Sequence, residues 1–166
     1  VHGKDITINR SSVEAHVAEE GEAKVEVYAG DVSEETGFSG WYDDDREYAI
    51  GFYETNFVGG RLDIRNASLV GAQIGSGSDS AYIDLRAGDM LIDNSSVIAE
   101  SLGNGSAKID MQAAYEYLYH NDYWVYQKEL FSGGLIKASN GSQISALVGR
   151  HGETEVHMRA GGPHKE

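Results

Sequence analysis

The chain lacks cysteine, has a single proline among its 166 residues, and carries few positive charges. Without cysteine it has no disulfide framework, although this leaves the cellular compartment open. Lys and Arg number 13 against 27 Asp and Glu, and the net charge of -14 repels phosphate backbones and anionic lipids, so nucleic acid is not an expected partner. No apolar run approaches the roughly 18 residues of a membrane span, and the first residues do not resemble a signal peptide. We therefore expect no membrane span and an export signal that has already been removed.

A repeated strand pattern dominates what the sequence does contain. The 40% hydrophobic content suits a folded core, and 21 glycines favour tight turns over helices, which predicts an all-β chain. An alternating segment that ends in alanine recurs four times, as GEAKVEVYA (21–29), DSAYIDLRA (79–87), GSAKIDMQA (105–113) and GETEVHMRA (152–160). Alternation with a period of two points one apolar row inward and one polar row outward, as in a half-buried strand.

Two shorter strands precede each copy. The nearer ones are SSVEA (11–15), ASLVGA (67–72), SSVIA (95–99) and GSQISA (141–146), and the farther ones are DITI (5–8), RLDI (61–64), MLI (90–92) and GLI (134–136). Ile83 and Ile109 are 26 residues apart, which suits three short strands joined by bends. The sequence thus predicts one β-solenoid domain, 1–166, a parallel β-helix of about four three-sided coils. A β-sandwich of twelve short strands is the alternative, but it gives no reason for equivalent residues to recur in register.

Two of these stretches carry a family resemblance. SNGSQISALVGRHGETEVHMRAGG and VHGKDITINRSSVEAHVAEEGEAKVEVYAGD resemble the coils of filamentous-haemagglutinin-type exoproteins of two-partner secretion. Repeats in that family run strand, Asn-Gly-Ser turn, QISA-like strand, Gly-rich turn, strand and AGG. The resemblance spans about 110 residues and implies right-handed coiling and an extracellular, usually non-catalytic stalk or adhesin.

Two insertions, at about 32–59 and 114–133, interrupt the repeat. They contain fourteen of the sixteen aromatic residues, and the alternation in each predicts a β-hairpin. Insertions in solenoids often carry binding, whereas the alternative is that both hairpins pack on the solenoid or on each other. For binding to glycans or to protein chains, the candidate residues are Trp41, Tyr42, Tyr48, Tyr53, Tyr115, Tyr117, Tyr119, Tyr123, Trp124 and Tyr126.

One column of outward residues is the main indication of catalysis. Stacking the four repeats aligns Glu26, Asp84, Asp110 and His157 on rungs about 4.8 Å apart, close to the roughly 5 to 5.5 Å between the carboxyl groups of retaining glycosidases. Neighbouring columns supply cations that would neutralise these acids on an ordinary solvated sheet. The leading interpretation is therefore a structural or adhesive protein and not an enzyme. A carbohydrate-active or carbohydrate-binding β-helix that uses the acidic column and the hairpins is the alternative.

The evidence for metal ions is weaker. Asp43, Asp44 and Asp45 could ligate Ca²⁺ through hard oxygens, although an acidic hairpin tip is more often only solvated. The segment GSGSDSA (75–81) resembles one calcium-binding nonapeptide, and such sites need consecutive copies. No other cofactor is expected.

Five of the seven asparagines begin an Asn-x-Ser sequon: Asn9, Asn66, Asn94, Asn104 and Asn140. Asn66, Asn94 and Asn140 share a turn position, where asparagine tolerates a left-handed backbone. In an exported protein of an organism with the machinery, all five are also acceptors for N-glycosylation. Both explanations stay open.

The end coils predict association. A solenoid exposes unpaired strand edges at its first and last coils, and we expect no cap at either end of this sequence. The chain is then either a section of a longer solenoid or a subunit that stacks head to tail into a filament, with the hairpins as lateral contacts.

Overall fold

The structure is a computed structural model. It describes residues 1–43, 46–77, 79–113, 115–121, 124–132 and 134–161. For residues 32–43, 46–58, 115–121 and 124–132 it describes the backbone alone, and for the others it also describes the side chains. Every regular element in these ranges is a β-strand. None of the described residues belongs to a helix of the length and hydropathy that a membrane span requires.

Most of the strands form three parallel sheets. Sheet A contains β1 (His2–Gly3), β4 (Ala23–Asp43), β8 (Ser80–Ala87), β11 (Ser106–Ala113) and β16 (Thr154–Ala160). Sheet B contains β2 (Ile6–Asn9), β6 (Arg61–Arg65), β9 (Asp89–Asp93) and β14 (Leu135–Ser139). Sheet C contains β3 (Ser12–Val17), β7 (Leu69–Ile74), β10 (Ser96–Ser101) and β15 (Gln143–Val148).

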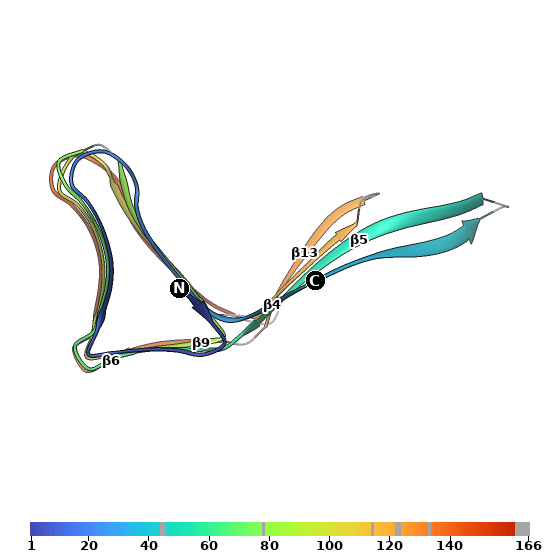
Figure 1. The fold of residues 1–166 in the computed structure, drawn as a ribbon, viewed down its shortest axis with the longest axis horizontal. Coiled ribbons are helices and arrows are strands. Elements are labelled where there is room, and N and C mark those ends of the chain that lie inside the picture. The colour runs from blue at the N-terminus through green and yellow to red at the C-terminus, as the bar shows by residue number, and fades with distance from the viewer. Residues whose placement is uncertain (44–45, 78, 114, 122–123, 133, 162–166) are drawn as a thin grey trace.

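The chain runs through the sheets in the order B, C, A, and it does so four times within the described residues. Each circuit, here called a pass, lies on the one before it, and Figure 1 looks along the stack so that the sheets form the sides of a triangle. Neighbouring passes pair in parallel in all three sheets, which a β-sandwich does not do. The described chain therefore has the solenoid-like parallel β structure that the repeat predicts.

The inward columns of sheet A have the predicted register. One contains Val25, Ile83, Ile109 and Val156, and the other contains Val27, Leu85, Met111 and Met158. Residues of the first three passes in these columns are at most 5% exposed. In the fourth pass, however, Val156 is 39% and Met158 is 55% exposed, because no described strand pairs with the outer edge of β16. The register is confirmed, and the burial of the fourth pass is not.

Asparagines shape the corner between sheets B and C. Asn66, Asn94 and Asn140 have positive φ angles of 61°, 45° and 53°. Asparagine is one of the few residues that adopts this left-handed conformation readily, because its short amide bonds locally. The Asn66 side chain donates a hydrogen bond of 2.8 Å to the Asn9 side chain of the preceding pass. The shared turn position predicted for the three asparagines is confirmed.

Serines at the same corner connect neighbouring passes. The Ser68 hydroxyl proton lies between two carbonyl oxygens, that of Arg65 in its own pass (2.6 Å) and that of Ile8 in the preceding pass (3.1 Å), and the hydroxyl oxygen accepts from the amide of Ser11 (3.3 Å). The Ser142 hydroxyl lies in the same way between the carbonyl oxygens of Ser139 in its own pass (2.6 Å) and of Ile92 in the preceding pass (2.9 Å). These bonds satisfy backbone groups at a bend where the sheet ladders are interrupted.

The corner between sheets C and A depends on glycine. A Cβ on Gly152 would lie 1.7 Å from the carbonyl oxygen of Gly105, and a Cβ on Gly105 would lie 1.8 Å from that of Asp79. No side chain fits at such distances, so only glycine lets the backbone of one pass approach that of the next so closely.

The two insertions form one antiparallel sheet that projects from the corner between sheets A and B (Figure 1). It consists of the distal part of β4 (31–43), β5 (Arg46–Gly59), β12 (Tyr115–Asn121) and β13 (Trp124–Ser132), and is called the fin below. Both predicted hairpins are present, and β5 pairs with β12, so the hairpins join edge to edge. The sequence left open that the hairpins pack on each other, and the structure shows that they meet as one sheet, through an edge-to-edge pairing that the sequence did not specify.

Replacing Ile109 by aspartate should unfold the chain. Ile109 is fully buried in the middle of an inward column, so the variant buries an unpaired charge at a cost above about 4 kcal/mol, a large share of ordinary domain stability. Gln112→Asp introduces the same charge on the outer face of β11, near Arg86 and Arg159, and should keep the parent melting temperature. A parental melting temperature for Ile109→Asp, measured by circular dichroism, would show that the register is wrong.

Replacing Ser101 by alanine should raise the stability of the fold. Its hydroxyl is fully buried in an inward column beside Ile74 and Val148 and has no hydrogen-bond partner among the described residues. Ser101→Ala should therefore stabilise the chain by about 1–3 kcal/mol in urea unfolding, because it removes an unsatisfied polar group. Ser142→Ala, which deletes a bonded hydroxyl, should destabilise it. A loss of stability in Ser101→Ala would mean that its hydroxyl has a partner.

Candidate functional site

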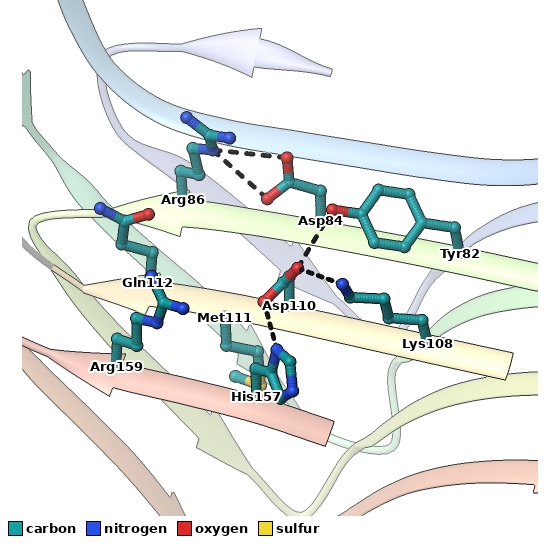
Figure 2. Close-up of a pocket in the computed structure, with 9 residues that line it drawn as sticks. All are labelled: Tyr82, Asp84, Arg86, Lys108, Asp110, Met111, Gln112, His157 and Arg159. Carbon is teal, nitrogen blue, oxygen red and sulfur yellow. Dashed lines mark hydrogen bonds and ion pairs between the residues drawn. The ribbon is translucent and has the colours of Figure 1, made fainter. Parts of the chain in front are cut away.

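The outer face of sheet A brings the predicted ionisable column together. Glu26, Asp84, Asp110 and His157 occupy equivalent positions on β4, β8, β11 and β16. A shallow depression of about 270 Å³ lies over the last three of these strands (Figure 2). Its lining residues are Tyr82, Asp84, Arg86, Lys108, Asp110, Met111, Gln112, His157 and Arg159.

Asp84 is only 5% exposed although it faces outward. The Tyr28 hydroxyl donates a 2.7 Å hydrogen bond to one carboxylate oxygen of Asp84, and the Arg86 guanidinium lies 3.3 Å from the same oxygen. That guanidinium also lies 5.3 Å from the centre of the Tyr28 ring, in the range of a cation–π interaction. Burial, and then the bond to Asp84, raise the pKa of Tyr28 above its ordinary value. The three side chains form a closed polar unit that holds the carboxylate in place.

Asp110 has a more open set of partners. Figure 2 shows contacts to its carboxylate from Tyr82 (3.3 Å), Lys108 (3.5 Å) and His157 (3.5 Å). Lys108 also lies 3.4 Å from Glu155, so this one ammonium bridges acids on two rungs. Burial and the neighbouring carboxylates of Asp84 and Asp110 raise the pKa of Tyr82 to about 12.

Glu26 completes the column at the first rung. The Lys24 ammonium lies 2.6 Å from its carboxylate, and this bond holds the pKa of Glu26 below its ordinary value. Each acid of the column therefore lies beside a cation. This pattern matches the prediction that neighbouring columns neutralise the acids, because like charges one rung apart destabilise a sheet.

The chemistry open to this face follows from that pairing. Hydrolysis of a glycoside by two carboxyl groups needs one that is protonated and one that is free to attack or to activate water. Asp84 is enclosed by a phenol and a guanidinium, and Asp110 accepts a hydrogen bond from Tyr82 and lies 3.5 Å from both Lys108 and His157. Gln112 and Arg159 add an amide and a guanidinium to the lining of the depression. The face is thus suited to holding a small polar or anionic group by hydrogen bonds.

The predicted aromatic contact residues gather on the fin. Their backbone positions are on β4 (Trp41, Tyr42), β5 (Tyr48, Tyr53), β12 (Tyr115, Tyr117, Tyr119) and β13 (Trp124, Tyr126), while Tyr123 lies outside the described residues. The register places Trp41 opposite Tyr48, and Tyr53 opposite His120. The side chains of all these positions lie outside what is described, so which way each ring faces stays a prediction.

The predicted calcium ligands lie at the tip of the first hairpin. β4 ends at Asp43, β5 begins at Arg46, and Asp44 and Asp45 lie outside the described residues, as does the side chain of Asp43. Among the side chains that are described, no group of three or more His, Asp or Glu is arranged to hold a metal ion. Calcium binding at this tip remains a prediction.

The five sequon asparagines, Asn9, Asn66, Asn94, Asn104 and Asn140, are all exposed. At the corner between sheets B and C, the geometry of the turn accounts for the spacing of asparagine and serine in the sequons. Asn66 and Asn140 supply the left-handed residue, and Ser68 and Ser142 supply hydroxyls that bond backbone carbonyls. A structural role thus explains these sequons without sugar, and the exposure keeps all five asparagines accessible as acceptors.

Sequence reasoning assigned no role to the two tyrosines that complete the charged face. Tyr28 and Tyr82 are the only aromatic residues outside the insertions. Tyr28 is directly opposite Arg86 in the register, and therefore diagonal to Asp84 and within reach of a phenol. Tyr82 is diagonal to Asp110 in the same way. Because the repeats predict this register, the diagonal position next to an acid is the sequence signal that could have identified both tyrosines as partners of the acids.

Comparison of the chain with protein-family models, with curated proteins and with solved structures gave no match.

Removing the Tyr28 hydroxyl should destabilise the fold. Tyr28→Phe leaves one oxygen of the buried Asp84 carboxylate without its phenol donor, at a cost of about 1–3 kcal/mol in urea unfolding. Tyr82→Phe is the matched control, because Asp110 keeps Lys108 and His157, and it should cost clearly less. Equal losses in the two variants would show that the Tyr28–Asp84 unit has no special role.

Proposed function

We propose that the chain is a structural and adhesive solenoid that works outside the cell, built as a right-handed parallel β-helix of four coils. The observation that carries this proposal is the fin, where fourteen of the sixteen aromatic residues of the chain lie in the two insertions that form one projecting sheet. Tyrosine and tryptophan are enriched where proteins contact partners, because each combines a large apolar body with a polar tip. The stack is the support, and the fin is the contact surface for a glycan or for another protein chain.

The connection between stack and fin favours a mechanical role. β4 is one strand of 21 residues, which pairs with β8 in sheet A and then continues into the fin beside β5. Such a continuous backbone ties the contact surface to a core with fully buried columns. A load on the fin would pass into the hydrogen-bond ladder of sheet A and be shared among its rungs.

The ionic pairing on the outer face supports a non-enzymatic function. Asp84 and Asp110 are the best candidates for a catalytic pair, and each is held by donors or cations from its own sheet. This pairing serves the stack, because it neutralises acids that stacking places one rung apart.

The extracellular location rests on the family resemblance of the repeats to filamentous-haemagglutinin-type exoproteins. Association through the ends of the stack belongs to the same proposal. Val156 and Met158 expose apolar surface that their equivalents Ile109 and Met111 bury under the next pass.

Tryptophan fluorescence gives a direct test of the fin as a contact surface. The chain has two tryptophans, Trp41 and Trp124, and both lie on fin strands, so the emission reports on the fin alone. Titration with a panel of neutral and acidic polysaccharides should shift or quench this emission for at least one member. Replacing the tryptophan that responds by phenylalanine should weaken binding by about tenfold, as expected for an aromatic contact residue.

Gln143→Ala serves as the control, because it removes an exposed side chain from sheet C, outside the depression on sheet A, and leaves the fin unchanged. Its affinity should equal that of the parent chain. If neither indole responds to any polysaccharide or to added unlabelled chain, the fin has a purely internal packing role and the adhesive function is wrong.

A further inference from the structure

The fin and sheet A share one axial repeat. Along sheet A the rungs are β4, β8, β11 and β16, and along the fin they are β4, β5, β12 and β13. The chain enters the fin after Ala29 of the first pass, returns on β5 into the second pass, enters it again after Ala113 of the third, and returns on β13 into the fourth. Each hairpin therefore spans two rungs, and two hairpins span four.

Strand directions also permit the pattern to continue. In the three solenoid sheets all strands run parallel, so any further pass is added in the same direction. In the fin, outgoing strands alternate with returning ones, and the last strand, β13, is a returning one. The next strand beside β13 must therefore be outgoing. The distal part of β4 is outgoing and pairs on one side only among the described strands.

We propose that the fourth pass binds the first pass of a second copy of this chain, displaced along the stack by four rungs, about 19 Å at 4.8 Å per rung. This single displacement places β4 of the second copy beside β16 in sheet A and beside β13 in the fin. It also places β2 beside β14 and β3 beside β15. The inference deepens the proposed function by identifying the partner surface, and it rests on the association part of that proposal.

The apolar surfaces at the two ends correspond in sheets B and C, whereas in sheet A Val25 and Val27 of the first pass are already buried. On the fourth pass, Val156 and Met158 are exposed, and Ile136, Ile144 and Val148 are only partly buried. On the first pass, Ile6, Val13 and Val17 are partly buried against the core. Inward rows of sheets B and C are thus incomplete at both ends, and the displacement joins them into continuous columns, as between passes of one chain.

The charges on the outer face correspond as well. With Val156 beside Val25 of the second copy, Glu155 lies beside Lys24 and His157 beside Glu26. Lys24, Tyr82, Lys108 and Glu155 occupy equivalent positions on successive rungs. Within one chain Glu155 lies 3.4 Å from the ammonium of Lys108 on the neighbouring rung, so a contact with Lys24 would repeat this pairing on its other side. Arg159 would lie beside Tyr28 on the side opposite Arg86, whose guanidinium lies 5.3 Å from the centre of the Tyr28 ring within one chain. The contact therefore repeats pairings found inside the molecule instead of opposing like charges.

A third feature of the stack has the same period. At the corner between sheets B and C, the register leaves two residues between the strands in passes one and three, and three residues in passes two and four. The additional residues are Ala67 and Gly141, which both have positive φ. A first pass placed on a fourth pass continues this alternation of short and long corners. Displacement by an odd number of rungs would break both this alternation and the alternation of the fin.

One element competes with this contact. β1 pairs with β4 at Tyr28 and Ala29, and the carbonyl of Val1 accepts from the amide of Tyr28 at 2.9 Å. In the proposed contact, Arg159 and Ala160 of the other copy take these positions, in the same strand direction. β1 must therefore leave the edge of β4 before β16 can bind there. We assign β1 as a short competing strand that limits assembly.

The competition predicts opposite effects for two variants. Deleting residues 1–3 should lower the concentration for half-assembly by about tenfold or more, because the open edge no longer has to release its own strand. Met158→Asp should abolish assembly with little change in melting temperature, since Met158 is 55% exposed in the single chain. Leu102→Asp is the matched control, as it charges a side chain of 49% exposure on a turn of the third pass. Sedimentation velocity measures all four chains.

Introduced cysteines test the register, because the chain has none of its own. In Glu26→Cys/His157→Cys the two cysteines lie three rungs apart in one molecule, about 14 Å, too far for a disulfide. In the proposed contact they are neighbours between copies, so mild oxidation should yield a ladder of covalent oligomers. Lys24→Cys/Arg159→Cys is out of register by four residues and should yield no covalent oligomers.

Electron microscopy of the parent chain should show filaments with an axial repeat of about 19 Å.

The outcomes separate the two proposals. A monomer at all concentrations, in both the parent chain and the deletion variant, would overturn association through the ends. Filaments that give no in-register ladder, or that are unaffected by Met158→Asp, would overturn this contact alone. Polysaccharide binding to the fin is measured independently on the monomeric Met158→Asp variant, and its absence would contradict only the adhesive function.

Discussion

The in-register stacking of short strands is the constraint on which the rest of this structure depends. A strand of five to eight residues buries one apolar row, and a single pass through three such strands encloses too little to be stable alone. In sheet A the inward columns are buried through the first three passes and exposed in the fourth, as the contrast between Ile109 and Val156 shows. Every corner must therefore bring backbones to the spacing of the rungs, and for this reason Gly105, Gly152 and the left-handed asparagines occur at the bends.

Stacking also determines the chemistry of the outer face. Equivalent outward residues lie about one rung, 4.8 Å, apart, so a repeat that places acids at one position creates a column of like charge. The chain compensates with residues from neighbouring columns: Arg86 and Tyr28 enclose Asp84, and Lys108 bridges Asp110 and Glu155. What resembles a catalytic pair in the sequence is thus explained by the electrostatics of the stack. This pairing is the reason for assigning the contact function to the fin instead.

The fin shows how a repeat can support a different structure without losing its register. An insertion into one pass has to return at the level of the next, and a two-stranded hairpin meets this condition because each of its strands occupies one rung. Two hairpins that begin after equivalent alanines, Ala29 and Ala113, are two rungs apart and meet edge to edge through β5 and β12. The aromatic residues are thereby collected in one sheet, which a single hairpin could not provide.

The sequence by itself determined the strands, their order and the columns they form, because a period of two and a recurrent alanine are local signals that each copy repeats. It also determined the turn position of Asn66, Asn94 and Asn140, since few residues tolerate that backbone. Only the tertiary structure decided the burial of Asp84 under Tyr28, the pairing of the two hairpins, and the placement of β1 on the edge of β4. Each of these joins segments from different passes, and such contacts depend on side-chain packing and on free strand edges, which the repeat pattern does not specify although it does specify the register.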